Sequence, residues 1–151
     1  MGYYELGLNT VAAATGAAYI SGIGATTIAA RMREMGFFCN AATASPVWIA
    51  RPGNTAALTG PTVGSAVDSD TDPVSLTGWA AAWGTAPTTP TVIYRRVSLP
   101  AVIGAGYVAV WNPGEEIVLS KTAGANQQLC LWNPTGGSTG SILSWYAKWA
   151  E

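Results

Sequence analysis

Histidine is absent from this sequence of 151 residues, and charged side chains are scarce. Histidine is the commonest general base and metal ligand in proteins, so its absence excludes Ser-His-Asp and Cys-His hydrolase mechanisms. Charged residues make up only 10% of the chain, whereas an ordinary soluble domain carries about 25%. We therefore expect no enzymatic activity and no cofactor. The low charge has two explanations: a surface of uncharged polar side chains, or a surface covered by other protein in an assembly.

Basic side chains do not cluster enough to indicate a nucleic acid partner. The chain has seven basic and eight acidic residues and a net charge of -1, whereas phosphate binding requires a concentrated basic surface. The uncharged stretch 6–30 is long enough to cross a membrane, but asparagine, threonine, serine and glycine residues interrupt it. The N-terminus lacks the basic region of a signal peptide. We therefore expect no nucleic acid, no membrane, and synthesis in the cytoplasm.

Cysteine occurs at two positions only. Cys39 and Cys130 are too few for a four-cysteine zinc site. Two thiols indicate little about the redox compartment, and a disulfide between them stays an open alternative.

Glycine and proline are abundant and separate short apolar runs. The 18 glycines and nine prolines fall between these runs rather than in one linker, which is typical of an all-β domain with many turns. A chain of this length can bury one sizeable core. We therefore predict a single domain over residues 1–151, built as a sandwich or a barrel. The strands predicted in the C-terminal half are 92–99, 107–111, 116–119, 127–132 and 141–150.

The last of these strands shows the clearest alternation. Leu143, Trp145, Ala147 and Trp149 share one face by the two-residue period, so we expect this face in the core. A terminal strand is normally frayed unless it is paired on both sides, so we place it centrally in a sheet.

The N-terminal half has weaker signals. Residues 28–38 combine good helix formers with flanking threonines and phenylalanines, and we predict a strand. Alternation along that strand would place Arg31, Arg33, Met35 and Phe37 on one face and Met32, Glu34 and Phe38 on the other. The first thirty residues are apolar and rich in glycine and threonine. They are predicted to form a strand, an arm that reaches a neighbouring subunit, or both, with residues 1–16 as the candidate extended N-terminal arm.

Three alternate aspartates have the spacing with which a calcium-binding loop begins. Asp68, Asp70 and Asp72 are candidates to converge on one hard cation. The rest of the loop departs from the calcium pattern, since Pro73 stands where glycine is needed and Trp79 where a bidentate glutamate is needed. We therefore favour a solvated acidic turn, with a weak metal site between subunits as the alternative.

Two adjacent pairs of like charge require partners. In a strand, one side chain of the Arg95-Arg96 pair must point inward or into a contact, and a desolvated arginine needs a carboxylate or a carbonyl. We expect a structural ion pair with Glu34 or with an aspartate of the acidic turn. Glu115 and Glu116 offer carboxylates for glycoside chemistry, but nothing in the sequence nominates the distant partner that this chemistry requires.

Aromatic residues are plentiful, with seven tryptophans, six tyrosines and two phenylalanines. Tryptophan stacks against sugar rings and also anchors protein interfaces, so its placement separates two functions. Exposed coplanar rings would indicate carbohydrate binding, whereas buried or subunit-facing rings would indicate assembly. We expect Trp48, Trp79 and Trp83, which lie in loop-like surroundings, at an interface, and we add Arg95 and Arg96 to the same candidate interface.

A series of short motifs runs along nearly the whole chain from about residue 12. They are Arg33-Glu34-Met35-Gly36-Phe37-Phe38, Ala50-Arg51-Pro52, Asp72-Pro73, Trp83 with Pro87 and Pro90, Tyr94-Arg95-Arg96, Leu99-Pro100-Ala101 with Gly104-Ala105-Gly106, Leu131-Trp132-Asn133, and Trp149-Ala150-Glu151. In order and spacing they resemble a family of small virion proteins of tailed bacteriophages. The resemblance implies a β-sandwich of jelly-roll type that decorates or cements the capsid shell, often as a trimer, and it assigns no catalytic residue.

The resemblance and the low charge together predict a structural protein. We expect an antiparallel, jelly-roll-like β-sandwich that forms a homo-oligomer, with a trimer favoured. Its expected partner is the major capsid protein, on the outside of the virion. The alternative is a carbohydrate-binding or receptor-binding module of a phage fibre or tail.

Overall fold

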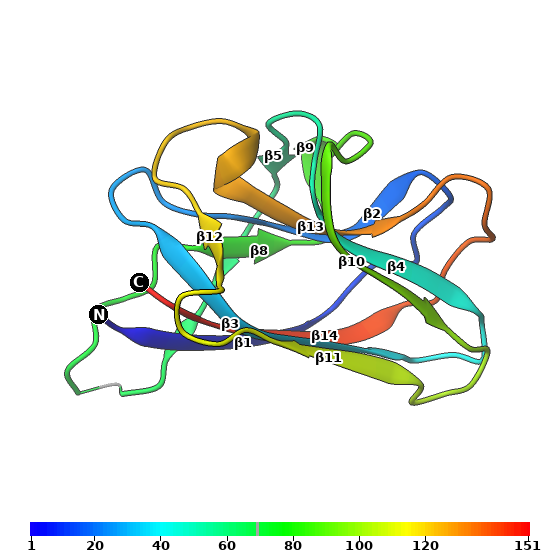
Figure 1. Cartoon of the computed structure of the whole chain (residues 1–151), viewed down its shortest axis with the longest axis horizontal. Helices are drawn as coiled ribbons and strands as arrows, with labels where there is room; N and C mark the ends of the chain where they lie inside the picture. The colour runs from blue at the N-terminus through cyan, green and yellow to red at the C-terminus, as the bar shows by residue number, and fades with distance from the viewer. Residues whose placement is uncertain (69) are drawn as a thin grey trace.

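The apolar runs between the turns of the sequence become strands, which a computed structural model shows as two antiparallel sheets packed face to face (Figure 1). The structure describes residues 1–68 and 70–151. Its longer strands are β1 (Tyr3–Asn9), β2 (Ala17–Ile23), β3 (Ala30–Cys39), β4 (Ser45–Arg51), β10 (Val92–Leu99), β11 (Gly106–Val110), β13 (Gln128–Asn133) and β14 (Leu143–Ala150). Its shorter elements are β5 (Ala57–Leu58), β6 (Thr62–Val63), β7 (Ser65–Ala66), β8 (Gly78–Ala80), β9 (Trp83–Thr85), β12 (Ile117–Leu119) and the 3-10 helix η1 (Ala125–Gln127).

The two sheets interleave strands from both halves of the chain. Sheet A has the order β11-β3-β14-β1-β7, with β12 also paired to β3, and sheet B has the order β10-β4-β13-β2-β8-β6. If the longer strands are numbered one to eight along the chain, sheet A reads 1-8-3-6 and sheet B reads 2-7-4-5. The predicted all-β antiparallel sandwich is therefore confirmed.

The C-terminal strand lies in the middle of its sheet, as its alternation predicts. β14 pairs with β1 on one side and with β3 on the other. Leu143, Trp145, Ala147 and Trp149 are all buried, while Ser144 on the opposite face is exposed. The two-residue period was a sufficient signal here because both neighbouring strands supply an apolar face to the same core.

The ambiguous segment 28–38 is extended, since β3 covers most of it. The register between β3 and β14 shifts where Lys148 lies opposite Glu34 but Trp149 lies opposite Met32. Arg33 is the additional residue of this β-bulge, so strict alternation is broken there. Met32 therefore shares the core with Met35 and Phe37, and the prediction that groups Arg33 with Met35 and Phe37 is wrong.

The first residues of the chain belong to the sheet. β1 pairs with β14 from Tyr3 opposite Ala150 to Asn9 opposite Ser144, within the same chain. Backbone hydrogen bonds of 2.8 and 3.0 Å join Gly2 and Glu151, so the two termini lie side by side (Figure 1). Residues 3–9 therefore adopt the predicted strand, within the segment 1–16 for which an arm was the other prediction.

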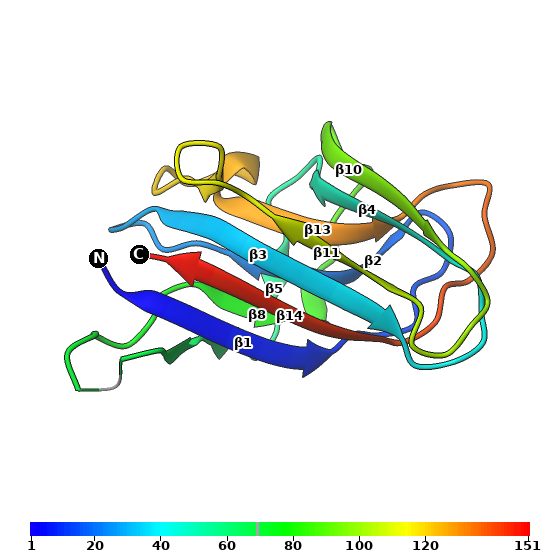
Figure 2. The same cartoon turned by 60° about the horizontal axis from the view of Figure 1, so that its bottom comes forward.

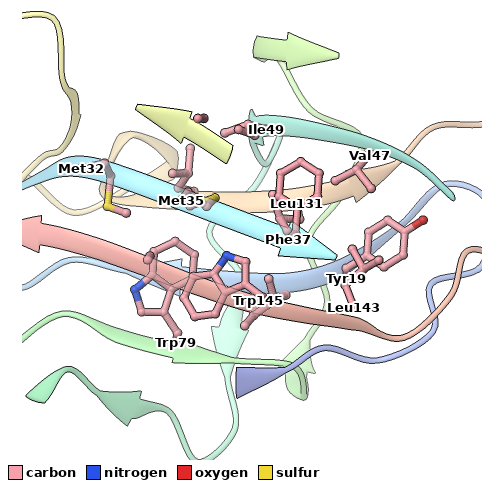
Figure 3. Packing of buried hydrophobic residues seen from close by; sticks show 14 of the residues in the cluster. Tyr19, Met32, Met35, Phe37, Val47, Ile49, Trp79, Leu131, Leu143 and Trp145 are labelled. Carbon is pink, nitrogen blue, oxygen red and sulfur yellow. The ribbon is translucent and has the colours of Figure 1, made fainter. Parts of the chain in front are cut away.

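An aromatic cluster fills the space between the sheets at the end where the termini lie. The Trp79 ring lies beside the Trp145 ring (Figure 3), with 4.6 Å between the ring centroids. The centroid of the Trp149 ring is 6.5 Å from that of Trp79. The Trp79 side chain is 0% exposed. Gly22 makes this possible, because a Cβ there would lie 2.5 Å from the indole. Trp79 is therefore a core residue, and its prediction as an interface residue is wrong.

A buried carboxylate fastens the segment that precedes β8. The Glu151 side chain accepts hydrogen bonds from the backbone N–H groups of Leu76 and Thr77, the Ser75 hydroxyl and the Trp149 indole, at 2.8–3.0 Å. Burial alone would raise the pKa of this carboxyl, but the hydrogen bonds outweigh burial and hold the pKa below its usual value. Glu151 is therefore an ionised anchor for the strand that carries Trp79.

The two cysteines do not meet. Cys39 and Cys130 are both buried and both free. Burial raises the pKa of the Cys130 thiol to about 12, so this thiol stays protonated and unreactive at neutral pH. The disulfide left open by the sequence is thus not formed.

The Trp79→Ala substitution should lower the free energy of unfolding by about 3–5 kcal/mol, because it leaves a cavity in the aromatic cluster. The matched control is Trp48→Ala, which removes a half-buried ring from the outside of sheet B. Urea denaturation of both variants measures the difference. Equal losses in the two variants would contradict the core position of Trp79.

The stability of the protein should also fall in acid because of Glu151. Its pKa is lower in the folded chain than in the unfolded chain. Its contribution is therefore complete above the ordinary glutamate pKa of about 4.3 and is lost as pH falls through the folded value. Unfolding free energies measured from neutral pH down to acid should show this loss in the wild type and in Glu115→Gln, which removes an exposed carboxylate. The Glu151→Gln variant should lack that component, and an unchanged acid dependence would refute the anchor.

Candidate interaction surface

The outer side of sheet B is already covered by the chain itself. A second apolar cluster, formed by Ala18, Ala50, Cys130 and Trp132, lies on this side, and Trp83 of β9 packs against it. β9 pairs with β5 in a small two-stranded sheet (Figure 1). The Gln128 side chain holds this covering segment, since it accepts from the Ala56 N–H at 3.0 Å and donates to the Ala56 carbonyl at 2.8 Å. Sheet B therefore has little of its outer face left for a partner.

In the described part of the chain the outer side of sheet A has no such cover, and Figure 2 shows its four long strands facing the viewer. We call this side the open face. The residues that project from it include Tyr3, Glu5, Gly7, Asn9, Arg31, Glu34, Gly36, Phe38, Gly106, Val108, Val110, Ser144, Tyr146 and Lys148.

Glycines make the open face flat. A methyl group at Gly36 would overlap the Tyr146 ring, and a methyl group at Gly106 would overlap the Phe38 ring. Both rings therefore lie across glycines of the neighbouring strand instead of standing up from the sheet. Gly7 opposes Tyr146 on the other side, so that cross-strand row has no tall side chain. A flat surface of this kind suits contact with another protein.

Charge on the open face is confined to one end, where a row of three charged residues crosses the strands and the exposed Arg31 lies beyond it. Lys148 lies between Glu5 and Glu34 on neighbouring strands, and its Nζ is 3.5 Å from Glu34 Oε1. The Tyr146 hydroxyl donates a hydrogen bond of 2.6 Å to the same carboxylate oxygen. That hydrogen bond, with burial and the nearby negative charge, raises the pKa of Tyr146 to about 12. One end of the open face is thus polar and the rest is nearly uncharged.

Exposed apolar side chains gather at the β11 border of the open face. Val108 and Val110 project from β11, and Val102 and Ile103 lie in the turn that leads into it; all four are exposed. An isolated exposed valine is ordinary, but four apolar side chains along one short segment form a patch that is typical of protein contacts.

The tryptophans and arginines predicted at an interface lie mainly on the other sheet. Trp48 and Trp83 are half-buried on the outside of sheet B. The Arg96 guanidinium stacks on Trp48, 4.8 Å from the ring centroid. Arg95 and Arg96 are both exposed, and neither forms an ion pair in the described residues. The predicted pairing of this arginine doublet with Glu34 or the acidic turn is therefore wrong.

A β-bulge in β10 explains the exposure of the arginine doublet. Ile93 and Arg95 lie opposite two consecutive residues of β4, so Tyr94 between them is the additional residue of the bulge. The bulge leaves Arg95 at the border of the sheet, where it lines a cleft of about 580 Å³ with Glu115 and Glu116.

The arginine that does point inward is Arg51, which no sequence pattern marks as buried. Arg51 is 8% exposed. It donates to the Tyr94 hydroxyl at 2.6 Å and to the Val118 and Gln128 carbonyls at 2.7 and 3.2 Å, and also to the Asn126 carbonyl. Carbonyl groups rather than a carboxylate thus stabilise this cation, and they tie sheet B to β12 and η1.

The carboxylates of the cleft have structural partners. Glu116 accepts from the Gly114 N–H at 2.7 Å and from Arg33 at 2.8 Å. Backbone hydrogen bonds and the nearby arginines lower the pKa of Glu116. Glu115 accepts a bond of 3.1 Å from the Asn112 amide. Glu116 is therefore ionised and engaged at both oxygens, which does not suit a general acid for glycoside chemistry.

The acidic turn also uses its carboxylates locally. Asp68 accepts from the Asp70 N–H at 3.1 Å, and hydrogen bonds from Thr71 and Asp70 lower its pKa. Asp72 accepts from the Tyr3 N–H at 3.1 Å instead. Within residues 1–68 and 70–151, no group of three or more histidine, cysteine, aspartate or glutamate side chains is placed to hold a metal ion. The same part of the chain contains no helix with the length and apolarity of a membrane span.

Comparison with family models, with curated proteins and with solved structures found no match to this chain. Function is therefore inferred from the surface of the molecule and from the residues of the sequence.

The Glu34→Gln substitution should lower the pKa of Tyr146 from about 12 towards the ordinary tyrosine value of about 10. It removes both the negative charge and the strong acceptor of the hydroxyl. The ultraviolet pH titration of each protein is compared with that of the same protein carrying Tyr146→Phe, and the difference in absorbance reports on Tyr146 alone. Glu5→Gln is the control, because Glu5 makes no hydrogen bond to Tyr146 and contributes only a smaller charge effect. An equal shift in both variants would contradict the ring placement on the open face.

Proposed function

We propose that this chain is a structural protein of a tailed-phage particle that decorates or cements the capsid by binding its outer surface. The observation that carries the proposal is the open face of sheet A, which is flat, uncovered and nearly free of charge outside one end. A sheet face of this size in a soluble domain normally carries many charges. A protein partner would remove the uncharged area from water.

The strand order supports the same reading. The orders 1-8-3-6 and 2-7-4-5 are compatible with a jelly roll, in which two Greek keys form a double sheet. Viral capsid proteins and lectins both use that architecture, so the fold alone does not choose between them. The motifs that run from Arg33-Glu34-Met35-Gly36 to Trp149-Ala150-Glu151 favour the virion.

The cementing function would be mechanical. A stable contact buries about 800 Å² on each partner. A decoration protein that bridges neighbouring capsid subunits would hold the shell together through contacts of this size. Association has an entropic cost, so a homo-oligomer that presents several contacts at once would bind more tightly than one copy.

The alternative is a carbohydrate-binding or receptor-binding module of a fibre or tail. The half-buried Tyr146 and Phe38 rings of the open face are its best support. Against it, all seven tryptophans lie in the described part of the chain and none of them is exposed. Coplanar exposed tryptophan rings, the feature expected of a glycan platform, are thus not what this chain presents.

The test is to bind the purified chain to particles from which it has been removed, prepared from the phage or prophage that encodes it. Wild-type protein should co-sediment with the particles, and gold-labelled antibody should mark the shell. Gly7→Lys, which places a cation on the flat part of the open face, should bind at least about tenfold more weakly.

The matched control is Gly84→Lys in β9, because Gly84 is also exposed and a side chain there also meets no close neighbour. It should bind like the wild type. Antibody label confined to tails or fibres would overturn the proposal in favour of the alternative. Absence of the chain from the particle, or equal weakening by both substitutions, would also overturn it.

A further inference from the structure

The border of a β-sheet exposes unpaired N–H and C=O groups, and proteins usually protect it by shortness, bulges or charge. In the described part of the chain, β6 and β7 end their sheets with two residues each. β10 carries a bulge and two exposed arginines. β11 has none of these protections. Its five residues, Gly106–Val110, contain no charge and no proline.

The backbone groups of β11 that face outward can be identified from its hydrogen bonds to β3. The Cys39 N–H donates to the Ala105 carbonyl at 2.8 Å, and the Trp111 N–H donates to the Arg33 carbonyl at 2.9 Å. Bonding residues alternate along an antiparallel strand. The N–H and C=O groups of Gly106, Val108 and Val110 therefore point away from β3, where the described residues supply no further strand.

We propose that β11 pairs antiparallel with β11 of a second copy of this chain, about a two-fold axis at Val108. Val108 then lies opposite Val108 of the second copy, and Gly106 lies opposite Val110 of that copy. Directly opposed residues of the bonded type exchange two hydrogen bonds. The three open residues are thus satisfied by the same three residues of the other copy, which is the self-complementarity that a two-fold contact requires.

The side chains fit this pairing. Gly106 has no side chain, and the Phe38 ring lies across it. Val110 of the second copy would therefore cover that ring. The exposed Val102 and Ile103 of the preceding turn extend the apolar contact, and no charged residue lies on β11 to repel its copy. Residues 6–9 of β1 form a second unpaired border, because β7 pairs only with the start of β1. Glu5 and Asn9 flank that border, and its described residues form no comparable apolar patch.

Pairing at β11 joins two open faces into one continuous surface. The pairing uses the border of sheet A and not a partner of the open face, so it does not depend on binding to the capsid. It also differs from the trimer that the family resemblance implies, because a two-fold contact closes after two copies.

Light scattering on the purified full chain over a micromolar dilution series tests the pairing. The wild type should show twice the 15.5 kDa of one chain and dissociate on dilution. Val108→Lys and Val110→Lys, each placing a cation beside the two-fold axis, should raise the dissociation constant at least about tenfold. Val92→Lys is the matched control, because Val92 lies on the border strand of sheet B and is 43% exposed, against 42% for Val108. It should dimerise like the wild type.

Hydrogen exchange gives a second readout that does not depend on a substitution. The amides of Gly106, Val108 and Val110 should be protected in the dimer and exchange rapidly in the dilute monomer. A monomer at all concentrations to about 100 µM, a trimer, unprotected amides in a dimer, or equal loss in Val92→Lys would each overturn the pairing. Particle binding is measured separately, so a failure here is distinguishable from a failure of the decoration function.

Discussion

The structure depends on one side chain that enters the core from outside the regular strand order. Between β4 and β10 the chain makes an excursion through five short strands, which pair with each other or at the borders of the two sheets, and Trp79 of this excursion lies between the sheets. Its indole fills the space over Gly22 and contacts Trp145, a residue of the central strand of sheet A. Glu151 fixes the segment before β8 from the opposite end of the sequence. The excursion can therefore lie over sheet B without loosening the sandwich, and that leaves sheet A as the uncovered side.

A few of the scarce charges of the chain join segments inside it. Arg51 directs its guanidinium at backbone carbonyls, Glu116 pairs with Arg33, and Glu151 accepts backbone amides. Each of these groups joins segments that are far apart in sequence. Most of the other charged side chains are exposed, and on the open face they are confined to one end. The charges thus stabilise the fold at a few points and leave most of the open face uncharged.

The strands could be predicted from the sequence wherever alternation and turn residues agree. β10 covers 92–99 as predicted, and β14 lies in mid-sheet because its alternation is unbroken. The misplaced side chains follow from β-bulges and from the excursion. One additional residue at Arg33 or at Tyr94 reverses the faces that follow, and no local composition marks a bulge. Trp79 has the local sequence of a loop residue, and its buried environment comes from β2 and β14, which lie more than fifty positions before and after it in the chain. The Glu151 anchor was equally hidden, since two of its four donors are backbone N–H groups, which every sequence contains.

The glycines of the open face have a consequence for orientation. A surface with ridges and hollows fixes how a partner sits on it through shape alone, whereas a plane permits sliding and rotation. Tyr146 and Phe38 lie flat over Gly36 and Gly106, so this surface offers few steric stops. The row formed by Glu5, Lys148 and Glu34 has alternating sign and a definite direction across the strands. The pattern of charges rather than shape would then set the orientation of a partner bound there. High salt would screen these charges and weaken the preferred orientation before it removed the contact.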